Sequence, residues 1–597
     1  MLNLKSRDGV SQTDVWSIED VFSSWKAWDA ELDALAQLLP SLAAFKGTLN
    51  QKNNVLDWLT NSVLFSERLE KLFIYVYMQT STDMSDEFTR AKQGQVESFG
   101  ARVMETLAFA EPELLEISMA QFSQWVHEDA QLDLYRPFFE KLQKGKPYVQ
   151  SAEIEAILGA LSEPFQTARQ IHPILTNGEL NFGQVQTDSA TVDIRQSNVA
   201  DLLAHPDREV RKTVWENYAH GHLQHKNTLS QCFLSGVKQN VFLAKTRGYS
   251  NSLEAALQPD RLSSDVFETF IRVFQANQHV WHRYWNVRKR FLGYSEQFEY
   301  DIKAPLASNP PSVPYSQAVQ WICEGMAPLG EDYVNVMRAG LTTERWVDVY
   351  PSQNKRLGAF SIGNSLTKPY IFMSYQDNLN GLSTLAHEVG HSMHSYLSTQ
   401  NQPPIYVQYT TFAAEVASNF NQAMVRDYLY RNATDRDFKI ALIEEAMGNF
   451  HRYFLVMPTL ARFELEVHKR IEQGEAIGSS DLNSLMATLL RECYGSEIHC
   501  DDAMNGIMWA QFSNHIYSNF YTWQYGTGIA AAHHLAFRVL EEGKSAADLY
   551  LKFLGAGGKL PPIEALRLAG VDMTQPEPIE AGFRVLEQWI DRLESLI

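Results

Sequence analysis

Apolar residues recur at helical spacing along most of the chain. In residues 25–42 they stand at Trp28, Leu32, Leu35 and Leu38, as expected for one face of a helix. Similar amphipathic stretches cover roughly 51–80, 86–110, 113–127, 131–145 and 151–170. The helical pattern resumes over about 198–291 and again from residue 381 to the end. The periodicity therefore predicts a mainly α fold.

Two short regions carry strand patterns instead. Residues 180–195 alternate around a polar turn, which predicts a β-hairpin. We place the end of an N-terminal helical lobe, residues 1–195, at this hairpin and assign residues 196–597 to a second lobe. Residues 346–350, 358–361 and 370–373 are rich in aromatic and β-branched residues, and they predict a small β-ribbon just before a helix over about 382–397.

The composition is that of a globular protein with a large negative charge. Of 597 residues, 45% are hydrophobic and 20% charged, and 51 Lys and Arg against 71 Asp and Glu give a net charge of −20. This balance argues against nucleic acid or an anionic membrane surface as the main partner. No window approaches about 18 uninterrupted apolar residues, and the start, Met1 to Gln12, is polar. With four scattered cysteines, the sequence predicts a cytoplasmic protein without a transmembrane segment or signal peptide.

The strongest chemical signal is the pentad His387-Glu388-Val389-Gly390-His391, inside the helix predicted over 382–397. Residues four apart lie on one face of a helix, so the imidazoles of His387 and His391 can bind one metal ion. Glu388 lies beside such an ion, where it can take a proton from a water molecule. The pattern H-E-x-x-H on a helix is typical of zinc peptidases, and a solvated helix with two histidines is the alternative.

A third metal ligand is expected from a neighbouring helix, predicted over about 408–430. Glu415 is the one acid in the apolar and small-residue stretch 410–418, beyond the helix break at Pro403-Pro404. A carboxylate is costly to bury without a partner, and a metal ion would provide one. Two imidazoles and a carboxylate suit Zn²⁺, one ion per chain, with a fourth position left for water and substrate. A glutamate at a helix edge, with its carboxylate in solvent, is the alternative.

Peptide hydrolysis also needs hydrogen-bond donors for the developing oxyanion, and residues 512–528 offer candidates. The segment contains one histidine and three tyrosines: His515, Tyr517, Tyr521 and Tyr525. They precede Gly526-Thr527-Gly528, which predicts a flexible hinge for a loop that closes over substrate. An aromatic cluster that belongs to the hydrophobic core is the alternative.

Taken together, these residues resemble the oligoendopeptidase F branch of the thimet-oligopeptidase family of zinc metallopeptidases. The resemblance extends along the chain to segments 15–22, 28–32, 205–211, 247–250, 355–361, 369–375 and 385–394. It implies two mostly helical lobes around a deep substrate channel, with the β-ribbon beside the H-E-x-x-H helix and the catalytic domain in residues 196–597. It also implies that His387, His391 and Glu415 bind zinc and that Glu388 is the general base.

The resemblance further implies roles in a substrate-closing loop over about 512–528. His515 matches the family's histidine in that loop, and Tyr521 and Tyr525 match its tyrosines by order. Which of the two tyrosines donates to the oxyanion stays open. Tyr517 is a further candidate for contact with the substrate.

The resemblance also implies a strand along the edge of the cleft, Tyr370 to Tyr375, with Gly358 and Ala359 near it. This strand would pair with the backbone of a bound peptide, so binding would depend on the length of the peptide more than on its sequence. The function implied is a zinc-dependent endopeptidase acting on short, unstructured oligopeptides, with the oligomeric state undetermined. The alternatives are an exopeptidase that releases C-terminal dipeptides, for which the sequence shows no cation, and a non-catalytic zinc protein that binds peptides.

Overall fold

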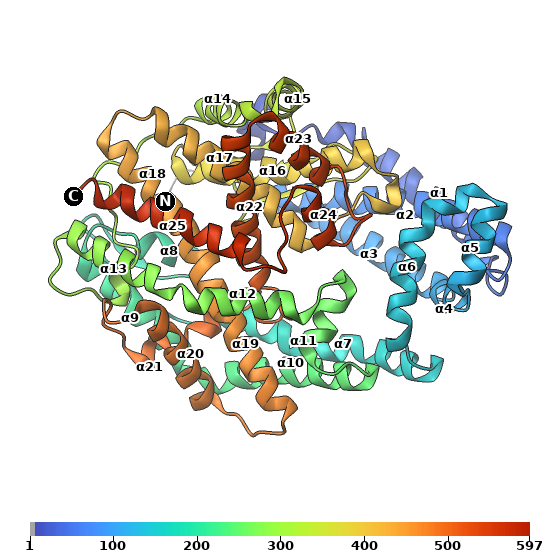
Figure 1. Cartoon of the computed structure of the whole chain (residues 1–597), viewed down its shortest axis with the longest axis horizontal. Coiled ribbons are helices and arrows are strands. Elements are labelled where there is room, and N and C mark those ends of the chain that lie inside the picture. Colours follow the sequence, from blue (N-terminus) through green and yellow to red (C-terminus); the bar gives the residue numbers. More distant parts are fainter. Residues whose placement is uncertain (1–5) are drawn as a thin grey trace. The chain divides into compact units, whose positions relative to one another are not determined.

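Helices account for most of the chain in the computed structural model, which describes residues 6–597 (Figure 1). The mainly α prediction is confirmed. The first five residues of the polar start Met1–Gln12 lie outside the described residues. The chain forms two compact units that alternate along the sequence. Unit 1 comprises the residues up to Pro147, Ser312–Leu429 and Leu535–Val571, and unit 2 comprises Tyr148–Pro311, Tyr430–His534 and Asp572–Ile597. The division into continuous lobes, 1–195 and 196–597, stays a prediction.

Unit 1 begins with helices whose buried residues form two hydrophobic clusters. They are α1 (Trp25–Ala43), α2 (Lys52–Thr82), α3 (Glu87–Leu107), α4 (Ala110–Leu115), α5 (Met119–Glu128) and α6 (Arg136–Gly145). Helices α1, α2 and α3 lie side by side (blue in Figure 1). On α1 the predicted face is buried at Trp28, Leu32 and Leu35, but Leu38 is 42% exposed and Leu39 is buried instead.

The remainder of unit 1 holds the predicted β-ribbon and the helices that follow it. These elements are α14 (Tyr315–Gly325), α15 (Glu331–Leu341), β3 (Val347–Asp348), β4 (Phe360–Ile362), β5 (Tyr370–Phe372), α16 (Leu379–Asn401), α17 (Thr411–Asn432, in this unit up to Leu429), the end of α22 (Trp523–Glu542), α23 (Lys544–Leu554) and α24 (Pro562–Leu568). The strand order is β3-β5-β4. Strand β5 pairs in parallel with β3 and antiparallel with β4, so both of its edges are occupied. All three β5 residues are buried, which explains their uninterrupted apolar run.

Unit 2 is also helical and contains the predicted hairpin. Its helices are α7 (Ala152–Ile174), α8 (Val199–Leu202), α9 (Arg208–Gln224), α10 (Lys226–Arg247), α11 (Ser252–Leu257), α12 (Ser264–Ala276), α13 (Gln278–Leu292), α18 (Arg436–His451), α19 (Met457–Glu472), α20 (Ser479–Tyr494), α21 (Asp502–Asn505), the start of α22 and α25 (Glu577–Glu594). The hairpin is β1 (Gln184–Gln186) paired antiparallel with β2 (Thr191–Asp193). A π-helical turn, Arg452–Val456, joins α18 to α19.

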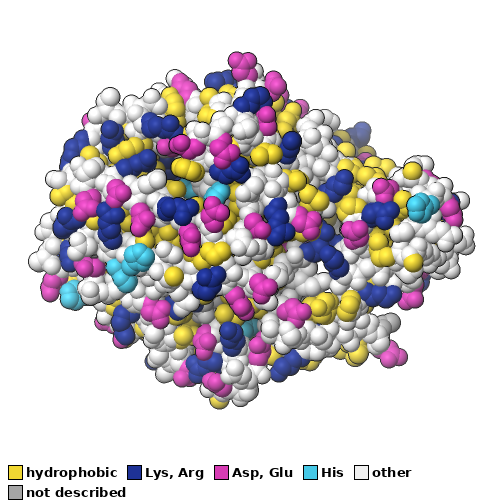
Figure 2. Space-filling view, in the orientation of Figure 1, with side chains coloured by type: hydrophobic (Ala, Val, Ile, Leu, Met, Phe, Trp, Pro, Cys, Tyr) yellow, Lys and Arg dark blue, Asp and Glu magenta, His cyan; other side chains and the backbone are white. Residues whose placement is uncertain are grey.

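Acidic and basic side chains are interspersed over the face of the molecule in Figure 2. On that face the acidic side chains are not gathered in one patch. All four cysteines are free. Within residues 6–597, no helix combines the length and the apolar character that a membrane crossing requires.

Candidate active site

The three predicted metal ligands converge inside unit 1. The Nε2 atoms of His387 and His391 lie 3.2 Å apart, and Nε2 of His387 lies 3.5 Å from Oε2 of Glu415. The ligand atoms of all three residues lie within 4.8 Å of one another. Tetrahedral ligands that each lie about 2.1 Å from a zinc ion are about 3.4 Å apart, so this arrangement fits zinc. It also explains why two histidine nitrogens approach so closely.

A glycine inside the pentad allows α16 and α17 to approach each other closely enough for this. A Cβ atom on Gly390 would lie 2.6 Å from the carbonyl oxygen of Ala417 and 2.7 Å from Cα of Ser418. Helix α16 spans Leu379–Asn401 and α17 spans Thr411–Asn432, close to the predicted 382–397 and 408–430. Residues four apart on α16 then face Glu415 on α17.

Hydrogen bonds orient two of the three ligand side chains, those of His387 and Glu415. Nδ1 of His387 lies 3.2 Å from Oε1 of Gln422, whose amide nitrogen donates to Oγ of Ser383 at 2.7 Å. This arrangement makes Nδ1 the protonated nitrogen of His387 and leaves the Nε2 lone pair for a metal. The Ser418 hydroxyl donates to Oε2 of Glu415 at 3.2 Å.

Glu388 lies next to the ligands without being one of the three converging groups. It is only 6% exposed, and burial raises its pKa to about 7, with His387 opposing the rise and Glu415 adding to it. A carboxyl group in such a place can accept a proton and later donate it. His394, on the same helix, is not a ligand: it stacks on Tyr409 at 3.5 Å between ring centroids, and burial lowers its pKa to about 3.

The predicted oxyanion donors form a second cluster, in unit 2. The hydroxyls of Tyr521 and Tyr525 are hydrogen-bonded at 2.8 Å, and the rings of Tyr525 and His515 lie 6.0 Å apart. Tyr453 stacks on Tyr525 with a centroid distance of 5.0 Å and an interplanar angle of 17°. Burial, and to a lesser degree the charge of Arg452, lowers the pKa of His515 to about 4, so its imidazole is neutral near pH 7.

The closing segment is irregular only between Phe512 and Thr522. Helix α22 begins at Trp523, so the predicted hinge at Gly526-Thr527-Gly528 is wrong, because those residues form part of a helix. Gly526 serves close packing instead: a Cβ atom there would lie 2.2 Å from the ring of Phe270.

The irregular segment is held by a buried carboxyl group. Phe520 has a left-handed backbone with φ of 49°, which is uncommon for a residue other than glycine. Its N–H donates to Oε1 of Glu464 at 2.7 Å, and its ring packs against Phe267 and His468. Burial raises the pKa of Glu464 to about 8. This anchor fixes the backbone next to Tyr521.

Tyr517 lies apart from the other tyrosines of the segment. Its hydroxyl lies 3.1 Å from Nδ1 of His172, whose Nε2 lies 2.8 Å from the carbonyl oxygen of Ala510. The hydroxyl is therefore engaged within unit 2, and Tyr517 joins the closing segment to α7. Its predicted contact with substrate stays a prediction.

Strand β5, which was predicted to pair with the substrate, lies in the centre of its sheet. Tyr370 is fully buried and donates its hydroxyl to the carbonyl of Ser17 at 2.9 Å, and β5 has no free edge for a peptide. Among the described residues β3 and β4 are the edge strands. Both residues of β3 are buried, whereas β4 is partly exposed and packs on α16. Gly358, exposed and with φ of +97°, and the partly buried Ala359 lead into β4.

Sequence reasoning missed Gln422 and Glu464. Gln422 stands seven residues after Glu415, two helical turns further along the same face of the helix. This spacing is the sequence signal that could have identified Gln422. Glu464 precedes Phe520 by 56 residues, and between the charged neighbours Arg462 and Glu466 it carries no local sign of its role.

Comparisons with known proteins identify the family to which the chain belongs. Residues 202–585 match the model of peptidase family M3, and residues 113–182 match that of oligopeptidase F. Oligopeptidase PepF of Bacillus subtilis is 33% identical over 100% of this chain and 89% of its own length. Group B oligopeptidase PepB of Streptococcus agalactiae is 31% identical over 99% of this chain and 98% of its own. The crystal structure of oligoendopeptidase-F from Enterococcus faecium is 26% identical with a TM-score of 0.75, covering 96% of this chain and 99% of that one. The chain therefore belongs to peptidase family M3 and is a metallo-oligopeptidase of its oligoendopeptidase F branch.

Proposed function

We propose that the chain is a zinc-dependent endopeptidase that hydrolyses internal bonds of short, unstructured oligopeptides. The observation that carries the proposal is the convergence of His387, His391 and Glu415, with buried Glu388 beside them. Relatives named oligoendopeptidase F support cleavage inside the peptide rather than at its ends.

A zinc ion held by the three ligands would supply Lewis acidity, polarising the scissile carbonyl and making water a better nucleophile. The carboxylate of Glu388 takes the proton of the attacking water and then passes it to the leaving amine. Its pKa of about 7 in the folded chain suits both steps. Gln422 and Ser418 keep the ligand side chains oriented.

Tyr521 and Tyr525, with neutral His515, are proposed to donate hydrogen bonds to the oxyanion that develops on the carbonyl. The backbone of the peptide is proposed to add to the free edge of β4, next to Gly358 and Ala359. We further propose a cytoplasmic enzyme with no nucleic-acid or membrane partner.

The test combines metal analysis with cleavage of an internally quenched peptide of about ten residues. We expect one zinc per chain, internal cleavage by mass spectrometry, loss of cleavage on chelation and its return with zinc. Glu388→Gln should keep zinc and peptide binding and lose turnover.

Each other outcome identifies an alternative. Release of C-terminal dipeptides would indicate an exopeptidase. Bound zinc without cleavage would indicate a peptide-binding protein. Turnover by Glu388→Gln would refute the role of the base.

A further inference from the structure

An arginine of unit 2, Arg452, lies next to the tyrosine and histidine cluster. The π-helical turn Arg452–Val456 presents Arg452 and Tyr453, and such turns occur often at functional sites. The ring of Tyr453 stacks on Tyr525, and the guanidinium of Arg452 lies 5.9 Å from the Tyr453 centroid. Arg452 is exposed, and it makes no hydrogen bond or ion pair with any of residues 6–597.

Lys303 is a second cation, and its charge interacts with that of Arg452. Lys303 is also exposed and makes no hydrogen bond or short ion pair with a described residue. Desolvation by the surrounding protein lowers the pKa of Lys303. The positive charge of Arg452 lowers this pKa further, whereas the negative charge of Asp201 raises it. Neighbouring His451 adds no charge near pH 7, because burial lowers its pKa to about 3.

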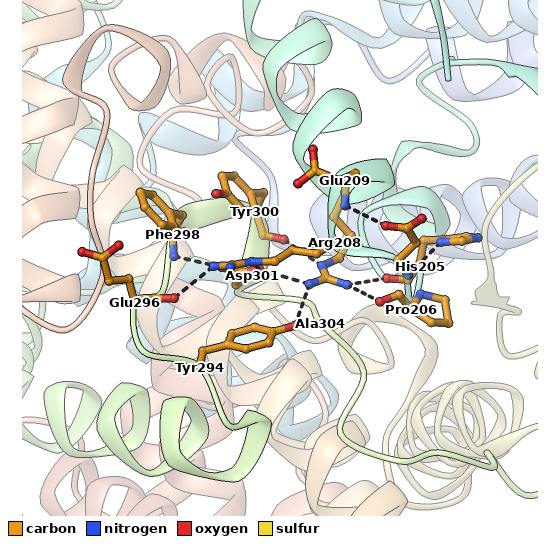
Figure 3. Close-up of polar contacts among 12 residues, drawn as sticks. His205, Pro206, Arg208, Glu209, Tyr294, Glu296, Phe298, Tyr300, Asp301 and Ala304 are labelled. Carbon is orange, nitrogen blue, oxygen red and sulfur yellow. Dashed lines mark hydrogen bonds and ion pairs between the residues drawn. The ribbon is translucent and has the colours of Figure 1, made fainter. Parts of the chain in front are cut away.

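The loop that carries Lys303 is held firmly. Figure 3 shows Arg208 reaching Asp301, and its nitrogens lie 2.7–3.2 Å from the carboxylate oxygens. The fully buried Arg211 donates to the same carboxylate at 3.0 Å and to the hydroxyl of Tyr294 at 3.0 Å. These contacts tie the loop to α9 two residues before Lys303.

The loop is also tied down one residue after Lys303, where the carbonyl of Ala304 accepts a hydrogen bond from buried Arg288. Anchors on both sides therefore fix the backbone of Lys303. In a chain with a net charge of −20, the exposed cations Lys303 and Arg452 thus repel each other, and this repulsion is unfavourable.

We infer that Arg452, with Lys303 beside it, forms a cationic subsite that binds a carboxylate of the peptide substrate next to Tyr525 and His515. The inference rests on the proposed function, which brings a peptide to these two residues. The guanidinium of an arginine matches a carboxylate in geometry and charge. No described residue forms a hydrogen bond or an ion pair with the guanidinium of Arg452. The carboxylate can be the C-terminus of the peptide or an Asp or Glu side chain, and the two sources are distinguishable.

The experiment measures binding without turnover, in the Glu388→Gln background with zinc present. Three fluorescent ten-residue peptides are titrated by anisotropy: a free acid with no acidic side chain, its C-terminal amide, and the amide with Glu as last residue. We expect the free acid to bind about tenfold more tightly than the amide, as a charge-assisted contact predicts. Arg452→Gln with Lys303→Gln should reduce this ratio to about one by weakening only the acid.

The matched control is Arg470→Gln, which removes an arginine of α19 that is paired with Glu475 at 2.8 Å and should leave the ratio unchanged. If the amide with terminal Glu binds like the free acid, a side-chain carboxylate also fits; if it binds like the plain amide, the subsite reads the C-terminus. Equal binding of acid and amide by the parent, or an unchanged ratio in the double variant, would overturn the subsite. Preferential binding of the acid by a chain that cleaves nothing would refute the proposed function and leave the subsite intact.

Discussion

Replacing Gly390 by alanine tests whether the close approach of two helices sets the metal geometry. The added Cβ would lie 2.6 Å from the carbonyl oxygen of Ala417 and 2.7 Å from Cα of Ser418. Both obstacles are backbone atoms of α17, so no side chain can rotate away. The helices themselves must separate, and Glu415 on α17 moves with them.

The size of the effect follows from these distances. An ordinary van der Waals contact of a Cβ atom begins near 3.4 Å, so the added Cβ would lie 0.8 Å too close to the carbonyl oxygen of Ala417. Metal–ligand distances tolerate only about 0.2 Å, so even a partial shift of Glu415 disturbs the site. We expect zinc affinity to fall about 10–100-fold, as it does when the support of a ligand is lost. The strain of overpacking should also destabilise the metal-free chain by about 1–3 kcal/mol.

The assay is competition for zinc with a chromophoric chelator, together with the Tm of the metal-free chain by circular dichroism. Gly448→Ala is the matched control, because a Cβ atom at that helical position would meet nothing within 4 Å. That control should keep its zinc affinity and gain about 1 kcal/mol from helix propensity. If both variants bind zinc as tightly as the parent, helix proximity does not set the ligand geometry and the reasoning fails.

Three further predictions concern the buried polar residues Gln422, Asp301 and Glu464. Gln422→Leu removes the acceptor of the His387 Nδ1 proton and should weaken zinc binding about 10–100-fold by chelator competition; unchanged affinity would contradict that role. Asp301→Asn leaves Arg211 buried without a counter-charge, and urea unfolding should show a loss of about 3–5 kcal/mol, whereas a loss below about 1 kcal/mol would mean that water replaces the pair. Burial raises the pKa of Glu464 to about 8, so the folded chain keeps a proton that the unfolded chain releases above its ordinary value of 4.5. Stability should therefore fall between pH 5 and 8, and Glu464→Gln should remove that part of the fall; identical pH dependence of the two chains in urea unfolding would show that the carboxyl does not hold the proton.

Local sequence patterns were sufficient for the helices and for the convergence of His387, His391 and Glu415. The ends of α16 lie within four residues of the prediction, because helical periodicity is a local property. His387 and His391 were placed correctly because spacing along one helix determines their separation. Glu415 could be named because it is the one carboxylate in an apolar stretch of a following helix.

The pairing of the β-strands could not be inferred in the same way. Strand β5 was expected at an edge, but the strand order β3-β5-β4 places it in the centre. Its three residues are all buried, and a fully apolar triplet is a sign of a central strand. Tyr370 is accordingly a core residue, and the residues that lead into β4 keep the exposure that a peptide contact requires.

The closing segment shows why glycine alone does not locate a flexible turn. Gly526 and Gly528 lie within α22, whereas the left-handed backbone falls on Phe520, which has a bulky side chain. A bulky residue keeps such a conformation only when surrounding contacts offset its strain. Here Glu464, on a helix 56 residues earlier in the chain, accepts a hydrogen bond from the Phe520 N–H. No local rule connects these two positions. The anchor precedes Tyr521 directly, so the orientation of the proposed oxyanion donors depends on a buried carboxyl group rather than on a hinge.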